Sequence, residues 1–306
     1  MKTITLGKST LQVPRIGVGC MRIAEMEQKQ IEQLIEAALA LGVHFFDHAD
    51  IYGQGECERR FAATVHSMKI PRDRFILQSK CGIVPGVMFD FSKDHILKSV
   101  DGILQRLNTD YLDVLLLHRP DTLVEPEEVA EAFDLLHKAG KVRWFGVSNQ
   151  TPHQILLLQQ SIDLPLVANQ LQFGPAYTPM ISSGLEANML TEGAVNRDGG
   201  ILDFCRLQNI TIQPWSPLQF GFFEGAFLAS PKYSKLNHVL QQLGEKYSAS
   251  PLTMAIAWIL RHPAKMQPIT GTTNPKRLQE CIWAADIAIT REEWYQVYLA
   301  AGNILP

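Results

Sequence analysis

Short apolar runs alternate with longer periodic segments along nearly the whole chain. The apolar runs predict buried strands at residues 16–19, 45–46, 75–77, 114–117, 144–147, 167–171, 210–213 and 267–269. Segments with apolar residues three or four positions apart follow them and predict helices near 28–41, 56–66, 92–107, 126–139, 152–160, 200–208, 235–247 and 275–285. Strands that alternate with helices in this way indicate a parallel sheet covered by helices.

Eight such units in 306 residues predict an α/β fold of the (β/α)8 TIM-barrel type. Residues 2–13 alternate around Gly7-Lys8-Ser9-Thr10, which predicts an N-terminal β-hairpin cap at the bottom of the barrel. A closing helix near 292–300 falls outside the eight units. No Pro/Gly/Ser-rich linker divides the chain, so we expect a single domain over residues 1–306. An open doubly wound sheet is the alternative architecture.

Two segments do not fit the alternation. Residues 173–197 are long for a strand-helix connection, and loops of this length are often functional. Residues 218–231 are rich in phenylalanine, at Phe220, Phe222, Phe223 and Phe227. This second segment either packs over a ligand or is anchored to the barrel by aromatic packing.

Charge and composition exclude several classes of protein. The net charge is −3 and there is no basic run, so the electrostatic pattern of a nucleic-acid-binding protein is missing. No stretch reaches the roughly 18 apolar residues of a membrane helix, and the N-terminus lacks a signal-peptide pattern. The five cysteines are scattered, as is common in a reducing compartment. We therefore expect a cytoplasmic protein, monomeric or weakly homo-oligomeric.

Reactive groups in such a barrel gather where strands end and loops begin. The polar residues just past the apolar runs are Asp47, Tyr52, Lys80, His118, Ser148, Asn149, Gln170, Trp215, Ser216, Gly271, Thr272 and Thr273. An ammonium at Lys80 should lower the pKa of Tyr52, which makes this phenol a better proton donor. Asp47 can keep Lys80 charged, and His118 can donate a hydrogen bond to a carbonyl oxygen beside Tyr52.

These four residues lack an electron source, and a nicotinamide would supply one. Ser148, Asn149 and Gln170 can hold its carboxamide, with Trp215 stacked on the ring. There is no GxGxxG motif after any strand, so a phosphate would meet residues 271–273 and the start of the helix at Pro275 instead. Arg277 is placed to meet a second phosphate.

A metal site is the competing interpretation of the segment around Asp47. His44, Asp47, His48 and Asp50 are all ligand types, but the chain offers no second His/Cys pair at metal spacing. We expect no metal, and we expect His44 and His48 to be partly buried, hydrogen-bonded barrel residues.

Five segments carry a resemblance to a known family: residues 46–53 (FDHADIYG), 79–82 (SKCG), 110–118 (DYLDVLLLH), 140–149 (GKVRWFGVSN) and 271–280 (GTTNPKRLQE). In this order they resemble the signature segments of the aldo-keto reductases, and most of all those of bacterial oxidoreductases. The resemblance implies NADPH-dependent reduction of an aldehyde or ketone. Tyr52 would then donate the proton, Lys80 and Asp47 would tune it, and His118 would orient the carbonyl.

The resemblance also extends to the cofactor. Ser148, Asn149 and Gln170 match the carboxamide-binding positions, and Trp215 takes the place of the stacking aromatic. Many members have a lysine where Gly271 stands, so the preference for NADPH would rest on Thr272 and Arg277.

The sequence ends soon after its last helix, so we expect the C-terminal loop that shapes the substrate pocket in longer members to be short. Substrate choice would then depend on Ile23, Ile83, Arg119 and the two long loops. A second function is compatible with the same residues. Some barrels of this kind bind a nicotinamide cofactor as regulatory subunits with slow or no turnover.

Overall fold

A closed barrel of eight parallel strands forms the centre of the molecule. The computed structural model describes residues 1–221 and 224–304. The barrel strands are β3 (Gly17–Gly19), β4 (Phe45–Asp47), β5 (Ile76–Cys81), β8 (Leu112–Leu117), β9 (Val142–Ser148), β10 (Leu166–Gln172), β11 (Thr211–Trp215) and β14 (Ile269–Thr270). Each of the eight predicted strands is present, and each pairs with its neighbours in parallel. The predicted (β/α)8 barrel is confirmed.

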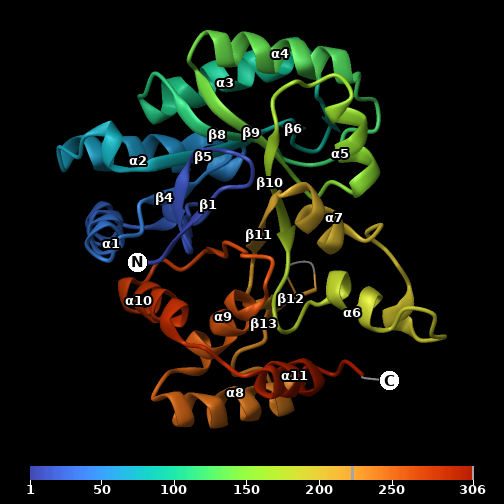
Figure 1. Ribbon diagram of the computed structural model, residues 1–306. Coiled ribbons are helices and arrows are strands. Elements are labelled where there is room, and N and C mark those ends of the chain that lie inside the picture. The colour runs from blue at the N-terminus through green and yellow to red at the C-terminus, as the bar shows by residue number, and fades with distance from the viewer. Residues whose placement is uncertain (222–223, 305–306) are drawn as a thin grey trace.

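Helices surround the barrel on its outside (Figure 1). They are α1 (Gln28–Ala40), α2 (Glu56–Ser67), α3 (Lys93–Leu107), α4 (Pro126–Lys138), α5 (Pro152–Gln159), α7 (Ile201–Gln208), α8 (Ser234–Tyr247) and α10 (Pro275–Trp283), with α11 (Arg291–Ala300) after them. The spacing that predicted them is the spacing of their buried faces. In α1, for example, Ile31, Leu34, Ile35 and Ala38 are buried against the core.

The N-terminal hairpin closes one end of the barrel, as predicted. Strands β1 (Thr3–Thr5) and β2 (Gln12–Pro14) pair antiparallel. Leu6 and Val13 are completely buried in a cluster with apolar residues from inside the barrel. Gly7 has a φ of +51°, and its amide donates to the Thr211 hydroxyl at 2.8 Å, which ties the hairpin to β11.

One helix was not expected from the sequence. Helix α9 (Pro251–Arg261) follows α8, and every residue from Thr253 to Leu260 is buried. Its sequence is apolar without interruption from Met254 to Leu260, and a continuous apolar run does not distinguish a helix from a buried strand. A further short helix, α6 (Pro179–Leu185), lies within the long 173–197 connection.

The phenylalanine-rich segment is anchored by aromatic packing, as one of the two alternatives predicted, and it also lines a cavity. Strands β12 (Gln219–Phe220) and β13 (Gly225–Ala226) form a small hairpin in it. The Phe220 ring packs 5.0 Å from that of Tyr233, and Phe227 is fully buried, which anchors the segment. Leu218, Gln219, Ala226 and Leu228 face a large cavity. Phe222 and Phe223 lie outside the described residues.

Over the described parts of the chain, every helix is too short or too polar to cross a membrane.

Candidate active site

A cavity of about 800 Å³ opens where the barrel strands end. This volume is in the range of small-molecule sites. It is lined by most of the predicted site residues, namely Asp47, Tyr52, His118, Ser148, Asn149, Gln170, Trp215, Ser216, Gly271, Thr272, Thr273 and Arg277. Several of them end a strand rather than follow it: Asp47, Ser148 and Trp215 are the last residues of β4, β9 and β11. Lys80 lies beneath the cavity surface, fully buried in β5.

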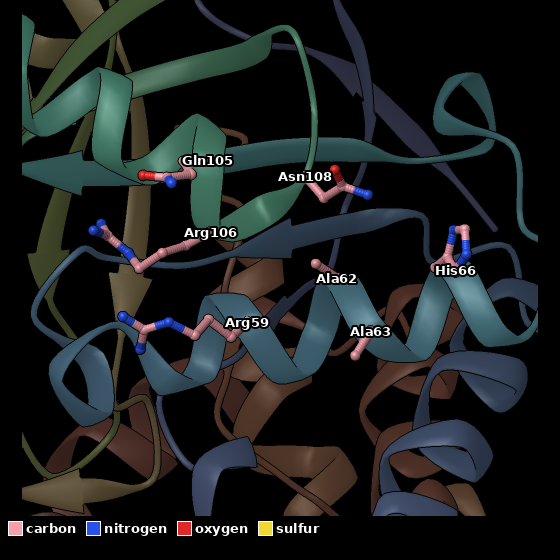
Figure 2. Close-up of a pocket in the computed structure, with 7 residues that line it drawn as sticks. All are labelled: Arg59, Ala62, Ala63, His66, Gln105, Arg106 and Asn108. Carbon is pink, nitrogen blue, oxygen red and sulfur yellow. The ribbon is translucent and has the colours of Figure 1, made fainter.

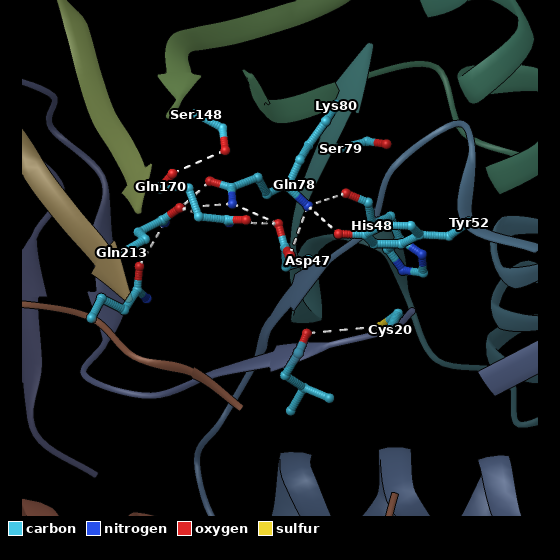
Figure 3. A network of polar contacts seen from close by, with 12 residues as sticks. Cys20, Asp47, His48, Tyr52, Gln78, Ser79, Lys80, Ser148, Gln170 and Gln213 are labelled. Atoms are coloured by element: carbon cyan, nitrogen blue, oxygen red, sulfur yellow. Dashed lines mark hydrogen bonds and ion pairs between the residues drawn. The ribbon is translucent and has the colours of Figure 1, made fainter. Parts of the chain in front are cut away.

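Lys80 connects the predicted acid to the predicted carboxylate. Its Nζ donates to Asp47 Oδ2 at 2.8 Å, to the His48 carbonyl at 2.7 Å and to Tyr52 Oη at 3.1 Å (Figure 3). The three donors of the ammonium are thus all used. Asp47 and Lys80 come from neighbouring strands, and Tyr52 begins the 3-10 turn Tyr52–Gly55 that follows β4. A strand end and a tight turn therefore hold the phenol against the ammonium.

The electrostatics of Tyr52 differ from the sequence-based expectation. Burial raises the pKa of Tyr52, and this effect outweighs the lowering by the Lys80 ammonium. The Lys80 charge does act to lower this pKa, but the prediction that it brings the pKa below its ordinary value is wrong for the protein alone, because burial of the phenol has the larger effect. Burial acts to lower the pKa of Lys80, but the Asp47 carboxylate opposes burial and the net shift is upward. At neutral pH the pair is therefore a neutral phenol beside a charged ammonium.

His118 lies beside the phenol. Its ring lies 5.9 Å from the Tyr52 ring, with the planes at 81°. Burial lowers the pKa of His118 well below its ordinary value, and the charges of Lys80 and Arg119 act in the same direction. His118 is therefore a neutral imidazole, which can donate one hydrogen bond but has no proton to give up at neutral pH.

A network of buried glutamines supports Asp47 from below, and sequence reasoning missed it. Gln78 and Gln170 each donate to Asp47 Oδ1, at 2.7 and 3.2 Å (Figure 3). Gln213 exchanges hydrogen bonds with Gln78 and donates to Gln267. A signal was available, because Gln78 and Gln213 lie two positions before Lys80 and Trp215, and alternate residues of a strand face the same side.

The four predicted nicotinamide-binding residues lie together on the cavity wall. Ser148 Oγ donates to the Gln170 carbonyl at 2.9 Å and accepts from Asn149 Nδ2 at 2.7 Å. Asn149 Oδ1 accepts from Trp215 Nε1 at 3.2 Å. Asn149 has a φ of +57°, which turns its side chain back toward Trp215 at the strand exit. These bonds fix an amide-rich wall beside an indole ring.

The predicted phosphate-binding residues lie at another part of the same cavity. Helix α10 begins at Pro275, and the Asn274 side chain caps it by accepting from the Lys276 amide at 2.9 Å. Thr272 Oγ1 accepts from the Asn274 amide at 3.2 Å. Space around Gly271 is open, since a Cβ added there would meet nothing within 4 Å. A loop with backbone N–H groups, hydroxyls and Arg277 at a helix start suits a phosphate.

The two histidines of the alternative metal site are not equivalent. His44 is partly buried, and its Nδ1 lies 3.2 Å from the Gly42 carbonyl. His48 is fully buried against Phe61, and neither ring nitrogen has a hydrogen-bond partner among the described residues. The prediction of a hydrogen-bonded His48 is wrong, because its ring fills an apolar space and burial lowers its pKa to about 3. Within the described ranges, no three His, Cys, Asp or Glu side chains converge as metal ligands would.

Of the residues expected to choose the substrate, two line the cavity and one does not. Ile83 and Arg119 are part of its wall. Ile23 is buried in the core.

A second hollow, of about 520 Å³, lies between α2 and α3 (Figure 2). It is lined by Arg59, Ala62, Ala63, His66, Gln105, Arg106 and Asn108, none of which was a candidate site residue.

Comparisons with known proteins agree with this picture of the barrel. The profile of the Aldo/keto reductase family matches residues 15–298, and the chain belongs to this family. Oxidoreductase YdhF of Escherichia coli is 33% identical, with 98% of each chain covered. A 6-dehydroglucose reductase of Agrobacterium fabrum is also 33% identical, with 96% of each chain covered.

A solved structure shares the fold. The crystal structure of Tm1743, a thermostable aldo-keto reductase in complex with the inhibitor epalrestat, superposes with a TM-score of 0.79 at 23% identity. The match covers 98% of this chain and 100% of that one. Family membership supports an oxidoreductase that reduces carbonyl groups, and enzymes of this family generally use nicotinamide cofactors.

Proposed function

We propose that this protein reduces an aldehyde or ketone to an alcohol with NADPH, and that Tyr52 donates the proton. The observation that carries this proposal is the Lys80 ammonium, which hydrogen-bonds both the Asp47 carboxylate and the Tyr52 hydroxyl. A partly buried phenol that lines the cavity and is held against a buried ammonium can give a proton to an oxygen in that cavity. The relative named 6-dehydroglucose reductase supports a carbonyl substrate.

The residues present fit a nicotinamide cofactor. The amide-rich wall of Ser148, Asn149 and Gln170 can bind a carboxamide, and the cavity continues from there to Thr272 and Arg277. When bound, the cofactor would supply a hydride to the carbonyl carbon. The choice of NADPH rests on Arg277 and the Thr272 hydroxyl, which offer a charge and a hydrogen bond to a 2'-phosphate.

Residues of this chain donate the proton and stabilise the charge that develops during the reaction. As the carbonyl carbon gains a hydride, its oxygen becomes negative and takes the Tyr52 proton, which completes the alcohol. The phenolate left on Tyr52 is stabilised by the hydrogen bond from Lys80, and Asp47 keeps Lys80 charged throughout. His118, as a neutral imidazole, donates a hydrogen bond to the carbonyl oxygen and orients it toward Tyr52.

The test combines binding and turnover. NADPH and NADH are titrated against the quenching of tryptophan fluorescence, and oxidation of bound NADPH is then followed after addition of 4-nitrobenzaldehyde. The proposal expects tight NADPH binding with aldehyde-dependent oxidation. Binding without oxidation would favour the regulatory subunit, and no binding would overturn the cofactor site.

A further inference from the structure

Arg119 brings a positive charge to the part of the cavity where the substrate reacts. It directly follows His118 and lines the same cavity as Tyr52. Its guanidinium carbon lies 5.9 Å from the centre of the Trp215 ring. Burial lowers the pKa of Arg119, and the nearby phenols of Tyr177 and Tyr52 act in the opposite direction. The charge is therefore partly removed from water and close to the proposed proton donor.

Arg119 is one of the charged side chains that line the cavity. Among the described residues that line the cavity, the charged side chains are Arg22, Asp47, Arg119 and Arg277. Asp47 is neutralised by Lys80. Arg277 lies at the proposed phosphate end, on α10. Arg119 thus adds a positive charge to the cavity wall that also includes Tyr52, the proposed proton donor.

The chemistry of the guanidinium narrows the substrate class. Its face can lie against an aromatic ring while its edge keeps N–H donors that match the two oxygens of a carboxylate. Such a pair is stronger in a partly desolvated cavity than on the surface. Other residues that line the cavity, such as Ile51, Ile83 and Leu228, are apolar and could contact the carbon skeleton of a substrate.

We propose that the substrate is an aldehyde that also carries a carboxylate, and that Arg119 binds this carboxylate while the carbonyl lies between Tyr52 and His118. This inference rests on the proposed reductase function and adds the class of substrate to it. In this arrangement the carboxylate takes no part in the chemistry. It orients the substrate so that the carbonyl oxygen meets the phenol.

The experiment compares matched pairs of aldehydes that differ only in this charge. The pairs are 4-carboxybenzaldehyde with methyl 4-formylbenzoate, and succinic semialdehyde with its methyl ester. With saturating NADPH, kcat/KM should favour each acid over its ester by about tenfold or more, through a lower KM. Equal kcat/KM values for acid and ester would overturn the inference.

Variants test whether the Arg119 side chain causes the preference for the acid over the ester. Arg119→Gln should remove most of the acid-over-ester ratio, and Arg119→Lys, which keeps the charge but loses the fork, should retain part of it. Arg22→Gln removes the same charge from another point of the cavity wall and should keep the ratio. If Arg22→Gln lowers the acid-over-ester ratio as much as Arg119→Gln does, the preference comes from the overall positive charge of the cavity. If Arg119→Gln lowers kcat/KM equally for acid and ester, Arg119 has a structural role. Either result would overturn the inference.

Two further outcomes separate the proposed carboxylate site from the cofactor site and from the reductase function. The affinity for NADPH should not fall in Arg119→Gln, since a fall that matches the loss for the acid would place Arg119 on the cofactor and overturn the inference. If the wild-type protein oxidises NADPH with neither member of any pair, the reductase function itself fails, and the substrate class fails with it.

Discussion

Lys80 and Tyr52 are joined by a hydrogen bond of 3.1 Å in which the ammonium donates to the phenol oxygen. The ammonium is fully buried, and its remaining partners are the Asp47 carboxylate and a backbone carbonyl. Its charge therefore acts on the phenol with little screening by water. The proposed reaction depends on this pair.

Arg277→Ala should weaken NADPH binding much more than NADH binding. The proposed contact is to the 2'-phosphate, which NADH lacks, so about a tenfold loss is expected for NADPH and less than about a twofold loss for NADH. Fluorescence titration measures both dissociation constants. Lys276→Ala is the matched control, because Lys276 is exposed next to Arg277 but does not line the cavity. Equal weakening of both cofactors in Arg277→Ala would remove the 2'-phosphate assignment.

Gly271→Lys should have the opposite effect. A side chain at this position meets open space, so the change is expected to leave the fold intact. An added ammonium beside the proposed phosphate site should tighten NADPH about two- to fivefold, as expected for a solvent-exposed ion pair. Gly271→Gln has similar bulk without the charge and should leave the affinity nearly unchanged. A gain of the same size with NADH would count against the assignment.

Asp50 should make the stability of the protein depend on pH. Burial, with the nearby Glu58 carboxylate, raises the pKa of Asp50 to about 7 from its ordinary 3.8. Between these two values the folded protein holds a proton that the unfolded chain has lost, so this group lowers stability as pH rises and its effect levels off above about pH 7.

Asp50→Asn removes this titration. Relative to wild type, the variant should gain about 2–3 kcal/mol more free energy of unfolding at pH 8 than at pH 5. Urea unfolding of both proteins at both pH values measures the difference. Using the difference between the two proteins cancels the other titrating groups, including His48. A gain that is the same at both pH values would show that Asp50 does not titrate in this window.

Asp113 should matter for stability and not for the reaction. It is buried near the start of β8, at the opposite end of the strand from His118. Its carboxylate accepts from Arg72 at 2.8 Å, from Arg143 at 3.0 Å and from the Leu77 amide at 2.9 Å.

Asp113→Ala leaves these donors without their acceptor and should cost about 3–5 kcal/mol of unfolding free energy, with kcat/KM unchanged in the protein that remains folded. Asp134→Ala breaks an exposed pair with Lys138 and should cost less than about 0.5 kcal/mol. Similar costs for the two variants, or a loss of kcat/KM in Asp113→Ala, would contradict this division of roles.

The barrel could be predicted from the sequence because its strands are short apolar runs and most of its helices have one apolar face. Helix α9 could not be, since its run from Met254 to Leu260 is apolar throughout and does not distinguish a helix from a buried strand. The short helix α6 was missed for a related reason, because its seven residues are too few to establish a period.

The candidate site was predictable where polar residues stand at strand ends, as at Asp47, Lys80 and His118. The glutamine network beneath them was missed, because Gln78 and Gln213 lie within strands and only the closed barrel brings their side chains together. The direction of the Tyr52 pKa was also missed. It depends on the balance between burial and the Lys80 charge, and burial of a single side chain is a property of the folded structure.

The most direct test of the proposed reaction follows the hydride and the proton donor together. NADPH that carries deuterium at both C4 positions of the nicotinamide is incubated with an aldehyde, and the alcohol is analysed by mass spectrometry for wild type and Tyr52→Phe. We expect one deuterium on the former carbonyl carbon with wild type. In Tyr52→Phe the rate should fall at least about 100-fold, while NADPH binding stays within about twofold. Alcohol without deuterium, or an undiminished rate in Tyr52→Phe, would contradict the assignment of Tyr52 as the proton donor in a nicotinamide-dependent reduction.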